Sequence, residues 1–296
     1  MSEPASQPLS EQLAPSLDGK VAIVTGAGAG LGRAEALALA AAGARVVVND
    51  LSDADLADTV AEIEAVGGKA LPVPGDVGER ATADALLSGA VDQFGGLHVV
   101  VNNAGLLRDR MLFNMTDEEW DLVVRVHLRG HFLLSRNAAA YWRAKYAESG
   151  GPVYGRVVNT ASEAFLLGAS GQPNYAAAKA GIAALTVVAA RSLARYGVRT
   201  NAICPRARTA MTVPVFGAAP HGGSDPWSVD HVATFVRYLA TPAADAINGQ
   251  VFIVYGGRIG LLAPPAIERR FDSVTALGDY FAGRDPDWTF AMREEL

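Results

Sequence analysis

The sequence predicts an α/β fold, a single doubly wound domain built around a parallel β-sheet. Two observations lead to this prediction. Short apolar runs, beginning with 21–24 and 45–49, alternate along the chain with longer, Ala-rich segments. The runs are continuously apolar, which is typical of strands buried on both faces of a sheet, and their alternation with helices indicates βαβ units. A chain of 296 residues suits one such domain.

Each expected element follows from its local pattern. The expected strands are 21–24, 45–49, 70–73, 97–101, 156–159, 198–203 and 250–254. The expected helices are 30–42, 53–66, 82–94, 116–146 and 174–196. Thr116 and Glu119 make a capping box at the start of the long fourth helix, and Pro173 suits the first turn of the last one. Ligands of such sheets bind beyond the carboxyl ends of the strands, where the strand order reverses.

Three segments divide the chain. Residues 1–17 are polar and rich in Pro and Ser, without the basic and apolar parts of a signal peptide, so we expect a mobile arm. Residues 18–257 form the main domain, which includes a Pro/Gly-rich loop at 209–227 that should lie on the ligand side. Residues 258–296 form a C-terminal extension that is too aromatic to be dismissed as disordered. Its aromatic side chains are Phe271, Tyr280, Phe281, Trp288 and Phe290.

Composition excludes several classes of protein. The net charge of −6 and the pI of about 5.4 give no general attraction for nucleic acid or anionic membranes. No apolar run reaches the roughly 18 residues that a membrane span needs. Cys204 is the single cysteine, so we expect no internal disulfide and no cysteine-based metal site, and interpret Cys204 as a packing residue. We therefore expect a cytoplasmic protein that binds no metal, nucleic acid or membrane.

A glycine-rich turn joins the first expected strand to the first expected helix. Glycines let backbone amides approach a pyrophosphate closely, and the helix N-terminus adds a partial positive charge. The strict G-x-G-x-x-G spacing is absent, because position 31 is Leu and position 33 is Arg. A flexible turn is the alternative, but the position between a strand and an Ala-rich helix favours a Rossmann-like dinucleotide site. The expected contacts are Gly26, Gly28, Gly30, Leu31 and Gly32.

Asp50 closes the second expected strand, 18 residues beyond Gly32. A carboxylate at about this position accepts hydrogen bonds from the adenosine ribose of NAD. It would also repel the 2′-phosphate of NADP, so we predict NAD as the cofactor. Arg33 argues weakly in the other direction, because a nearby arginine can accept that phosphate, and an Asp at a strand end can also be merely solvated.

Tyr175 and Lys179 are candidates for acid–base chemistry. Residues four apart share one helix face, and we expect the Lys179 ammonium, together with a positive nicotinamide, to lower the Tyr175 pKa from about 10 towards the operating pH. The spacing alone also fits an ordinary amphipathic helix. Ser162 strengthens the catalytic interpretation, because it follows the strand at 156–159 and should lie at the sheet edge to which this helix returns. Ser170 competes for that role, but belongs to the approach to the helix.

Taken together and in order, these motifs resemble a short-chain dehydrogenase/reductase over about residues 18–257. The resemblance implies that Ser162 and Tyr175 hold the reacting oxygen and that Lys179 also binds the nicotinamide ribose. It implies further cofactor contacts from three places: the adenine side, the turn after the fourth strand, and the start of the ligand-side loop. These contacts are Asp76, Val77, Asn103, Ala104, Gly105 and Thr209.

Two positions depart from the family pattern. His127 stands where the family usually has a catalytic asparagine that supports a proton-conducting water chain. We include His127 among the catalytic candidates, with a packing role as the alternative. Arg206 follows Pro205 where the family normally has glycine. Arg206 and Arg208 would border the site, either to meet an acidic substrate tail or to face solvent, and for Arg208 we expect solvent.

Residues 106–110 and 126–132 resemble the dehydrogenase part of peroxisomal multifunctional enzyme type 2, as does the stretch 48–51. The resemblance implies a bulky hydrophobic secondary alcohol or its ketone, such as a (3R)-hydroxyacyl-CoA or a 17β-hydroxysteroid. A 3-oxoacyl-(acyl-carrier-protein) reductase is the related alternative. A non-catalytic NAD-binding sensor or scaffold would predict a damaged Ser/Tyr/Lys set, whereas all three residues are present. The family also implies a homotetramer or homodimer, so a structural interaction role is not exclusive of catalysis.

Overall fold

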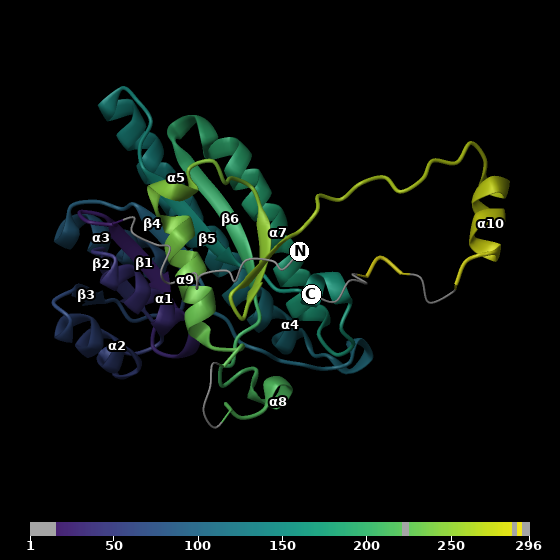
Figure 1. The fold of residues 1–296 in the computed structure, drawn as a ribbon, viewed down its shortest axis with the longest axis horizontal. Coiled ribbons are helices and arrows are strands. Elements are labelled where there is room, and N and C mark those ends of the chain that lie inside the picture. Colours follow the sequence, from purple (N-terminus) through teal and green to yellow (C-terminus); the bar gives the residue numbers. More distant parts are fainter. Residues whose placement is uncertain (1–15, 221–224, 286–288, 292–296) are drawn as a thin grey trace, which may run out of the picture.

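The computed structural model describes residues 16–220, 225–285 and 289–291, and one eight-stranded sheet forms its centre (Figure 1). The strand order is β3-β2-β1-β4-β5-β6-β7-β8. The strands are β1 (Val21–Thr25), β2 (Arg45–Asn49), β3 (Lys69–Pro72), β4 (Val99–Asn102), β5 (Gly155–Thr160), β6 (Val198–Pro205), β7 (Val251–Tyr255) and β8 (Arg258–Leu261). The doubly wound α/β prediction is therefore confirmed, and the strand order reverses between β1 and β4.

The edge strand β8 departs from the expected parallel sheet. It pairs antiparallel with β7, whereas all other neighbours in the sheet are parallel. Gly256 and Gly257 connect the two strands with φ values of 51° and 77°. Two consecutive residues with positive φ make the tight hairpin turn that antiparallel neighbours require. The predicted boundary at residue 257 consequently falls inside this hairpin, and the sheet takes in the start of the extension.

Helices cover both faces of the sheet. The α-helices of the described residues are α1 (Gly30–Ala41), α2 (Asp53–Ala65), α3 (Arg80–Phe94), α4 (Asp117–Val124), α5 (Gly130–Ser149), α6 (Ala164–Leu167), α7 (Pro173–Leu193), α8 (Val213–Phe216), α9 (Val229–Ala240) and α10 (Val274–Ala282). The side chains of α1, α2 and α9 share one core cluster with alternate residues of the central strands. Those of α3, α5 and α7 pack on the opposite face.

Two helical regions differ from the sequence-based expectation. The long helix expected over 116–146 is divided into α4, a π-helical turn at Arg125–Arg129, and α5. Such π-bulges are rare and occur often at functional sites. The capping box of Thr116 and Glu119 is present as predicted. Helix α9 was not predicted, although it is amphipathic and buries Val232, Phe235, Val236 and Leu239.

One helical segment, Pro173–Tyr196, is long and apolar enough to cross a membrane by length and composition, which corrects the expectation that no such run exists. Core helices pass the same test. This segment packs against β6 and buries Ile182 together with the polar side chains of Asn174 and Lys179, while 28% of its apolar window is buried and Val188 is 60% exposed.

The chain leaves the body of the domain after β8, and α10 lies apart from the sheet (Figure 1). None of the nine residues of α10 is buried, and Val274 and Phe281 are 85% and 54% exposed. Tyr280 contacts both Phe271 and Phe281, so the aromatic side chains of this segment pack on one another. Trp288 and the expected N-terminal arm, apart from residues 16 and 17, lie outside the described residues.

Candidate functional site at the carboxyl edge of the sheet

The glycine-rich turn between β1 and α1 is shaped by close backbone contacts. A Cβ on Gly32 would overlap the carbonyl oxygen of Gly26, and a Cβ on Gly28 would lie 2.5 Å from the Asp55 carbonyl oxygen. Gly26 and Gly30 also have positive φ values of 65° and 53°. Glycine is therefore required at these positions by packing and by backbone conformation.

The N-terminus of α1 fits an anionic ligand. Its N-cap residue, Ala29, makes no side-chain cap, and the first turn contains no acidic residue. Ala29 and Gly30 are exposed, while Leu31 is buried beneath them. The first amides of a helix lack intrahelical partners and carry a partial positive charge, so this turn can hold a pyrophosphate, as the sequence predicts.

Asp50 lies at the end of β2 beside the same turn. Its carboxylate accepts hydrogen bonds from the backbone N–H groups of Gly28 and Leu51, both at 2.9 Å. The carboxylate is thereby held next to the glycine turn, where an adenosine ribose would bind. Arg33 is not directed at this point, because it forms an ion pair with Glu62 of α2.

The turn after β4 is tied to β1. The Thr25 hydroxyl accepts hydrogen bonds from the N–H groups of Asn103 and Ala104, at 3.0 and 3.1 Å, and the Asn103 amide donates to the Thr25 carbonyl at 3.0 Å. A Cβ on Gly105 would overlap the His127 ring. These contacts hold the turn at the reversal of the strand order.

The other predicted cofactor contacts surround the same edge. Asp76 accepts a hydrogen bond from Gly78 N–H at 2.7 Å and pairs with Arg125 at 2.8 Å, so its carboxylate is already engaged by the protein. Val77 contacts the start of α5, where a Cβ on Gly130 would lie 3.0 Å from Val77 Cγ2. Thr209 lies against the glycine turn, with its Cγ2 3.4 Å from a Cβ built on Gly30.

Ser162, Tyr175 and Lys179 come together at the ends of β5 and α7. The Ser162 hydroxyl is hydrogen-bonded to the Tyr175 phenol. Lys179 Nζ lies 5.3 Å from the centre of the Tyr175 ring and donates a hydrogen bond to the Thr160 carbonyl at 2.5 Å. The Asn174 side chain fixes the start of α7 by donating to the Arg108 and Glu119 carbonyls, at 3.0 and 3.1 Å. Ser170 is exposed and lies outside this group.

Burial sets the pKa values of this group, which differs from the sequence-based expectation for Tyr175. Burial raises the Tyr175 pKa to about 12, although the hydrogen bond with Ser162 acts in the opposite direction. Burial also lowers the pKa of Lys179 to about 7. The Lys179 side chain is 2% exposed, and a charge in such a place loses its hydration. Desolvation therefore sets the Tyr175 pKa, and Lys179 does not lower it in the protein alone.

His127 connects the turn after β4 with Tyr175. Its Nε2 lies 2.8 Å from the Leu106 carbonyl oxygen and 3.0 Å from the Leu106 amide nitrogen. Its ring meets the Tyr175 ring edge-on, with centroids 5.2 Å apart. Burial lowers the His127 pKa to about 3, with a contribution from Lys179, so the ring is neutral at physiological pH. A neutral, buried imidazole braces the two segments against each other.

His131, one turn further along, is a buried histidine that the sequence analysis did not single out. It is 2% exposed, and burial holds its pKa well below the usual value. Backbone groups of His127 and Asn102 hydrogen-bond to the ring, while Nε2 has no partner among the described residues. Its spacing of four from His127 is the signal that could have identified it.

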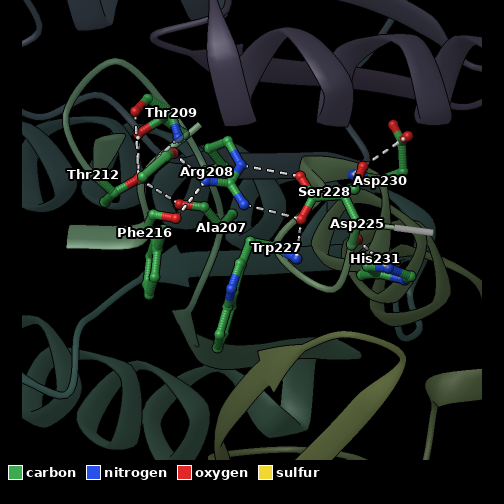
Figure 2. A network of polar contacts seen from close by, with 11 residues as sticks. Ala207, Arg208, Thr209, Thr212, Phe216, Asp225, Trp227, Ser228, Asp230 and His231 are labelled. Carbon is green, nitrogen blue, oxygen red and sulfur yellow. Dashed lines mark hydrogen bonds and ion pairs between the residues drawn. The ribbon is translucent and has the colours of Figure 1, made fainter. Parts of the chain in front are cut away.

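The two arginines after β6 face neither solvent nor open space. Arg206 forms a bidentate ion pair with Glu163, and Arg208 forms one with Asp225. The Arg208 side chain is only 13% exposed, so the expectation that it faces solvent is wrong. Arg208 also donates to the carbonyls of Phe216 and Gly217, which makes it the centre of the polar network in the 209–227 loop (Figure 2).

Sequence reasoning missed the acidic partners of these arginines. Glu163 directly follows Ser162, and Asp225 lies near the end of the predicted ligand-side loop. The signal was Arg206, at a position where the family pattern has glycine, with a second cation at Arg208, because partly buried cations need counter-charges. Cys204 is buried and unpaired with another cysteine, as predicted. Within residues 16–220, 225–285 and 289–291, no cluster of three or more His, Cys, Asp or Glu side chains could hold a metal.

Comparison with known proteins gives a consistent result. The pattern of the short chain dehydrogenase family matches residues 20–217. The hydroxyacyl-CoA dehydrogenase ChsB1 of Mycobacterium tuberculosis is 61% identical, over 94% of this chain and 93% of that protein. A 3-oxoacyl-[acyl-carrier-protein] reductase of Synechocystis is 39% identical, over 82% of this chain and 98% of that one.

Peroxisomal multifunctional enzyme type 2 of Mus musculus is 40% identical over 83% of this chain, which spans 33% of that longer protein. Among solved structures, a short chain dehydrogenase from Mycobacterium avium superposes with a TM-score of 0.81 and 43% identity. The matched region covers 90% of this chain and 94% of that structure.

Proposed function

Because the chain belongs to the short-chain dehydrogenase family and is an oxidoreductase acting on CH–OH groups, we propose that it interconverts a 3-hydroxyacyl-CoA thioester and its ketone, with NAD as the hydride carrier. The observation that carries the reaction type is the grouping of Ser162, Tyr175 and Lys179 at one edge of the sheet. The substrate class is supported by the relative that is 61% identical and is named a hydroxyacyl-CoA dehydrogenase.

The proposed chemistry divides the work among three side chains. When bound, the oxidised nicotinamide supplies the hydride acceptor. Tyr175, as the phenolate, takes the proton from the substrate hydroxyl, and Ser162 stabilises the developing oxyanion by donating a hydrogen bond. Lys179, with its lowered pKa of about 7, can exchange a proton near neutral pH from its position beneath the Tyr175 ring. Reduction uses the same groups in reverse.

The choice of NAD over NADP rests on Asp50. Its carboxylate lies beside the glycine turn, where it would accept hydrogen bonds from the ribose hydroxyls of NAD and repel the 2′-phosphate of NADP. Arg33, the nearby cation that could have accepted that phosphate, is neutralised by Glu62. We expect kcat/KM with NAD to exceed that with NADP by about 100-fold or more. In Asp50→Asn this ratio should fall by about tenfold or more, whereas equal rates of the wild-type protein with both cofactors would contradict the proposal.

A panel of NAD-linked assays tests the substrate class. It should contain 3-hydroxyacyl-CoA thioesters of several chain lengths, 17β-hydroxysteroids and short secondary alcohols, with NADH absorbance as the readout. We expect the highest kcat/KM for a hydroxyacyl-CoA. Preference for a hydroxysteroid would replace the proposed substrate but keep the reaction type. No NADH with any alcohol, despite tight NAD binding, would support the sensor or scaffold role instead.

Reduction of 3-oxoacyl-(acyl-carrier-protein) is a second candidate, because the Synechocystis relative named for that activity matches 82% of this chain. Both candidate substrates are 3-oxoacyl thioesters, and they differ in the carrier. Competition between the acyl-carrier-protein and CoA forms of one acyl chain separates them. Faster turnover of the carrier-protein form, with NADPH preferred, would favour the reductase.

A further inference from the structure

An ion pair between Arg206 and Glu163 lies directly beside the serine of the site. Arg206 Nε and Nη2 donate to the two carboxylate oxygens of Glu163 at 2.6 and 2.7 Å. The side chains are 23% and 11% exposed, so the pair is largely shielded from water. Bidentate, charge-assisted pairs are directional as well as strong, and they fix the groups that carry them.

Arg206 is itself held by the sheet. Its backbone N–H donates to the Val254 carbonyl of β7 at 2.9 Å. Its guanidinium lies over the Tyr255 ring, 5.0 Å from the ring centre, and Tyr255 stacks on Trp227 at 5.4 Å. The ends of β6 and β7 therefore hold the guanidinium group of Arg206 in one orientation.

Glu163 belongs to a short segment in which Ala164 is buried and Phe165 packs against the core cluster that contains Ala161. The Ser162 hydroxyl accepts a hydrogen bond from the Ala164 N–H at 3.2 Å, and the Glu163 carbonyl accepts from the N–H groups of Leu166 and Leu167 at 2.8 and 2.9 Å. Helix α6 has only four residues and ends at Gly168, which has a φ of 62°. So short a helix is not stable by itself. Beside the backbone hydrogen bond from Ala161 N–H to the Ile203 carbonyl at 2.7 Å, the ion pair of Arg206 with Glu163 is thus a charged side-chain connection between the Ser162 turn and the sheet.

We propose that Arg206 is a positioning residue for Ser162, which it holds in place through Glu163. Ser162 must present its hydroxyl to both Tyr175 and the substrate oxygen, and a displacement of about 1 Å can lower a rate by about 100-fold. Arg206 stands where the family pattern has glycine, which could not make this contact. The inference rests on the proposed function, since it assigns Arg206 a part in the same reaction.

Charge balance is the second consequence of the pair. Arg206 neutralises a carboxylate that would otherwise be unpaired near the reacting groups. The charge of Glu163 reaches this space, because it contributes, after burial, to the raised pKa of Cys204. The other ionisable groups that face Tyr175 are Lys179 on α7, Cys204 on β6, His127 on the π-turn and Asp109 after β4. A lone anion here would oppose formation of the Tyr175 phenolate.

The kinetic test uses Arg206→Gln, Glu163→Gln and the charge-exchanged variant R206E/E163R. We expect Arg206→Gln to lower kcat by about 10- to 100-fold with the KM for NAD nearly unchanged, and the exchanged pair to recover a substantial part of that loss. In a Ser162→Ala background, Arg206→Gln should lower kcat by less than about twofold, because its effect passes through Ser162. Lys145→Gln, which breaks the exposed ion pair with Glu148, is the matched control and should leave kcat unchanged.

Two results would overturn the inference. One is an equal loss of kcat from Arg206→Gln with and without the Ser162 hydroxyl, which would make its effect independent of Ser162. The other is a raised KM for the acyl substrate with unchanged kcat, which would make Arg206 a substrate contact.

Hydrogen–deuterium exchange gives a readout that needs no turnover. The amide of Ala164 is bonded to Ser162 Oγ, so exchange in the peptide 162–168 should accelerate by about tenfold or more in Arg206→Gln. Unchanged exchange would contradict the positioning role. If the wild-type protein oxidises no alcohol, the proposed function fails, while the exchange experiment still decides whether Arg206 holds the serine turn.

Discussion

The two halves of the carboxyl edge are held by different kinds of contact. Along β1 to β5, neighbours approach the backbone so closely that an added Cβ would overlap the Gly26 carbonyl at Gly32 and the His127 ring at Gly105. From β6 onward, the corresponding edge is held by side chains that are distant in sequence. These are the ion pairs Arg206–Glu163 and Arg208–Asp225 and the stacked rings of Phe216, Trp227 and Tyr255.

Substitutions should therefore be tolerated less well in the first half of this edge than in the second, where one pair of side chains can be exchanged for another. At Gly28 and Gly32, the neighbouring backbone carbonyls leave no room for a Cβ, so these positions admit only glycine. An ion pair or a ring stack can be replaced by another pair of similar size. The cofactor side is therefore set by short motifs, and the proposed substrate side is set by pairings between side chains that are distant in sequence.

Tyr175→Phe should have the largest effect, because Tyr175 lies where the two halves meet. The change removes the phenolic oxygen that we propose carries the proton, while the ring can still pack against His127. We expect kcat to fall by about 1000-fold with NADH affinity nearly unchanged, measured by steady-state kinetics and by NADH fluorescence. Near-normal turnover would remove Tyr175 from the proposed mechanism.

Gly32→Ala tests the rigidity of the cofactor side. The new Cβ would overlap the Gly26 carbonyl, and backbone cannot move aside as a flexible side chain can. We expect a loss of about 3 kcal/mol in the free energy of unfolding and much weaker NAD binding, measured by urea denaturation and calorimetry. Gly278→Ala in α10 is the control, since its Cβ meets nothing within 4 Å and alanine favours a helix. Equal losses at the two positions would refute the comparison.

The cofactor side was predictable because its signals are local. Apolar runs marked the strands to within about two residues, and the glycine turn and Asp50 are adjacent to the strands that carry them. Parallel strands end at one edge of the sheet, so the meeting of Ser162 with the α7 residues Tyr175 and Lys179 also follows from the topology.

The other side could not be predicted in the same way. Arg206 and Glu163 are 43 positions apart, and they meet only because β5 and β6 pair in one particular register and β7 adds the ring of Tyr255. The raised pKa of Tyr175 in the protein alone was likewise not predicted, because burial is a property of the assembled fold. Helix α9 was missed although its amphipathic pattern and the capping Ser228 are present in the sequence.

Glu35→Met should stabilise the cofactor side, in contrast to the other changes there. Glu35 of α1 is fully buried, neither carboxylate oxygen has a partner among the described residues, and burial raises its pKa to about 8. Its carboxyl group is neutral in the fold but ionises near 4.5 when the chain unfolds. Wild-type stability from this group is therefore present below pH 4.5 and is lost as the pH rises through about 8.

The methionine variant lacks this loss, so its advantage should grow with pH. We expect the free energy of unfolding of Glu35→Met to exceed that of the wild type by about 2 kcal/mol at pH 8 and by much less at pH 5. Urea denaturation at both pH values measures this difference. Glu64→Met, at an exposed position of α2, should show no such dependence. A constant difference between Glu35→Met and wild type at the two pH values would show that the buried carboxyl does not titrate as proposed.

Arg208→Gln should have the smallest effect and shows how the second half differs from the first. Arg208 joins Asp225 to the Phe216 and Gly217 carbonyls, so it connects the two ends of the loop at 209–227 (Figure 2). Glutamine can reach only one of these partners. Because the stack of Phe216 on Trp227 still joins the middle of the loop to its end, we expect a loosened rather than an unfolded loop. The KM for the acyl substrate should rise by about fivefold with kcat and NAD affinity nearly unchanged, and limited proteolysis should cut within 209–227 sooner. A loss of NAD binding as large as that of Gly32→Ala would show that the two halves are not independent, because the loop would then support the cofactor side through Thr209.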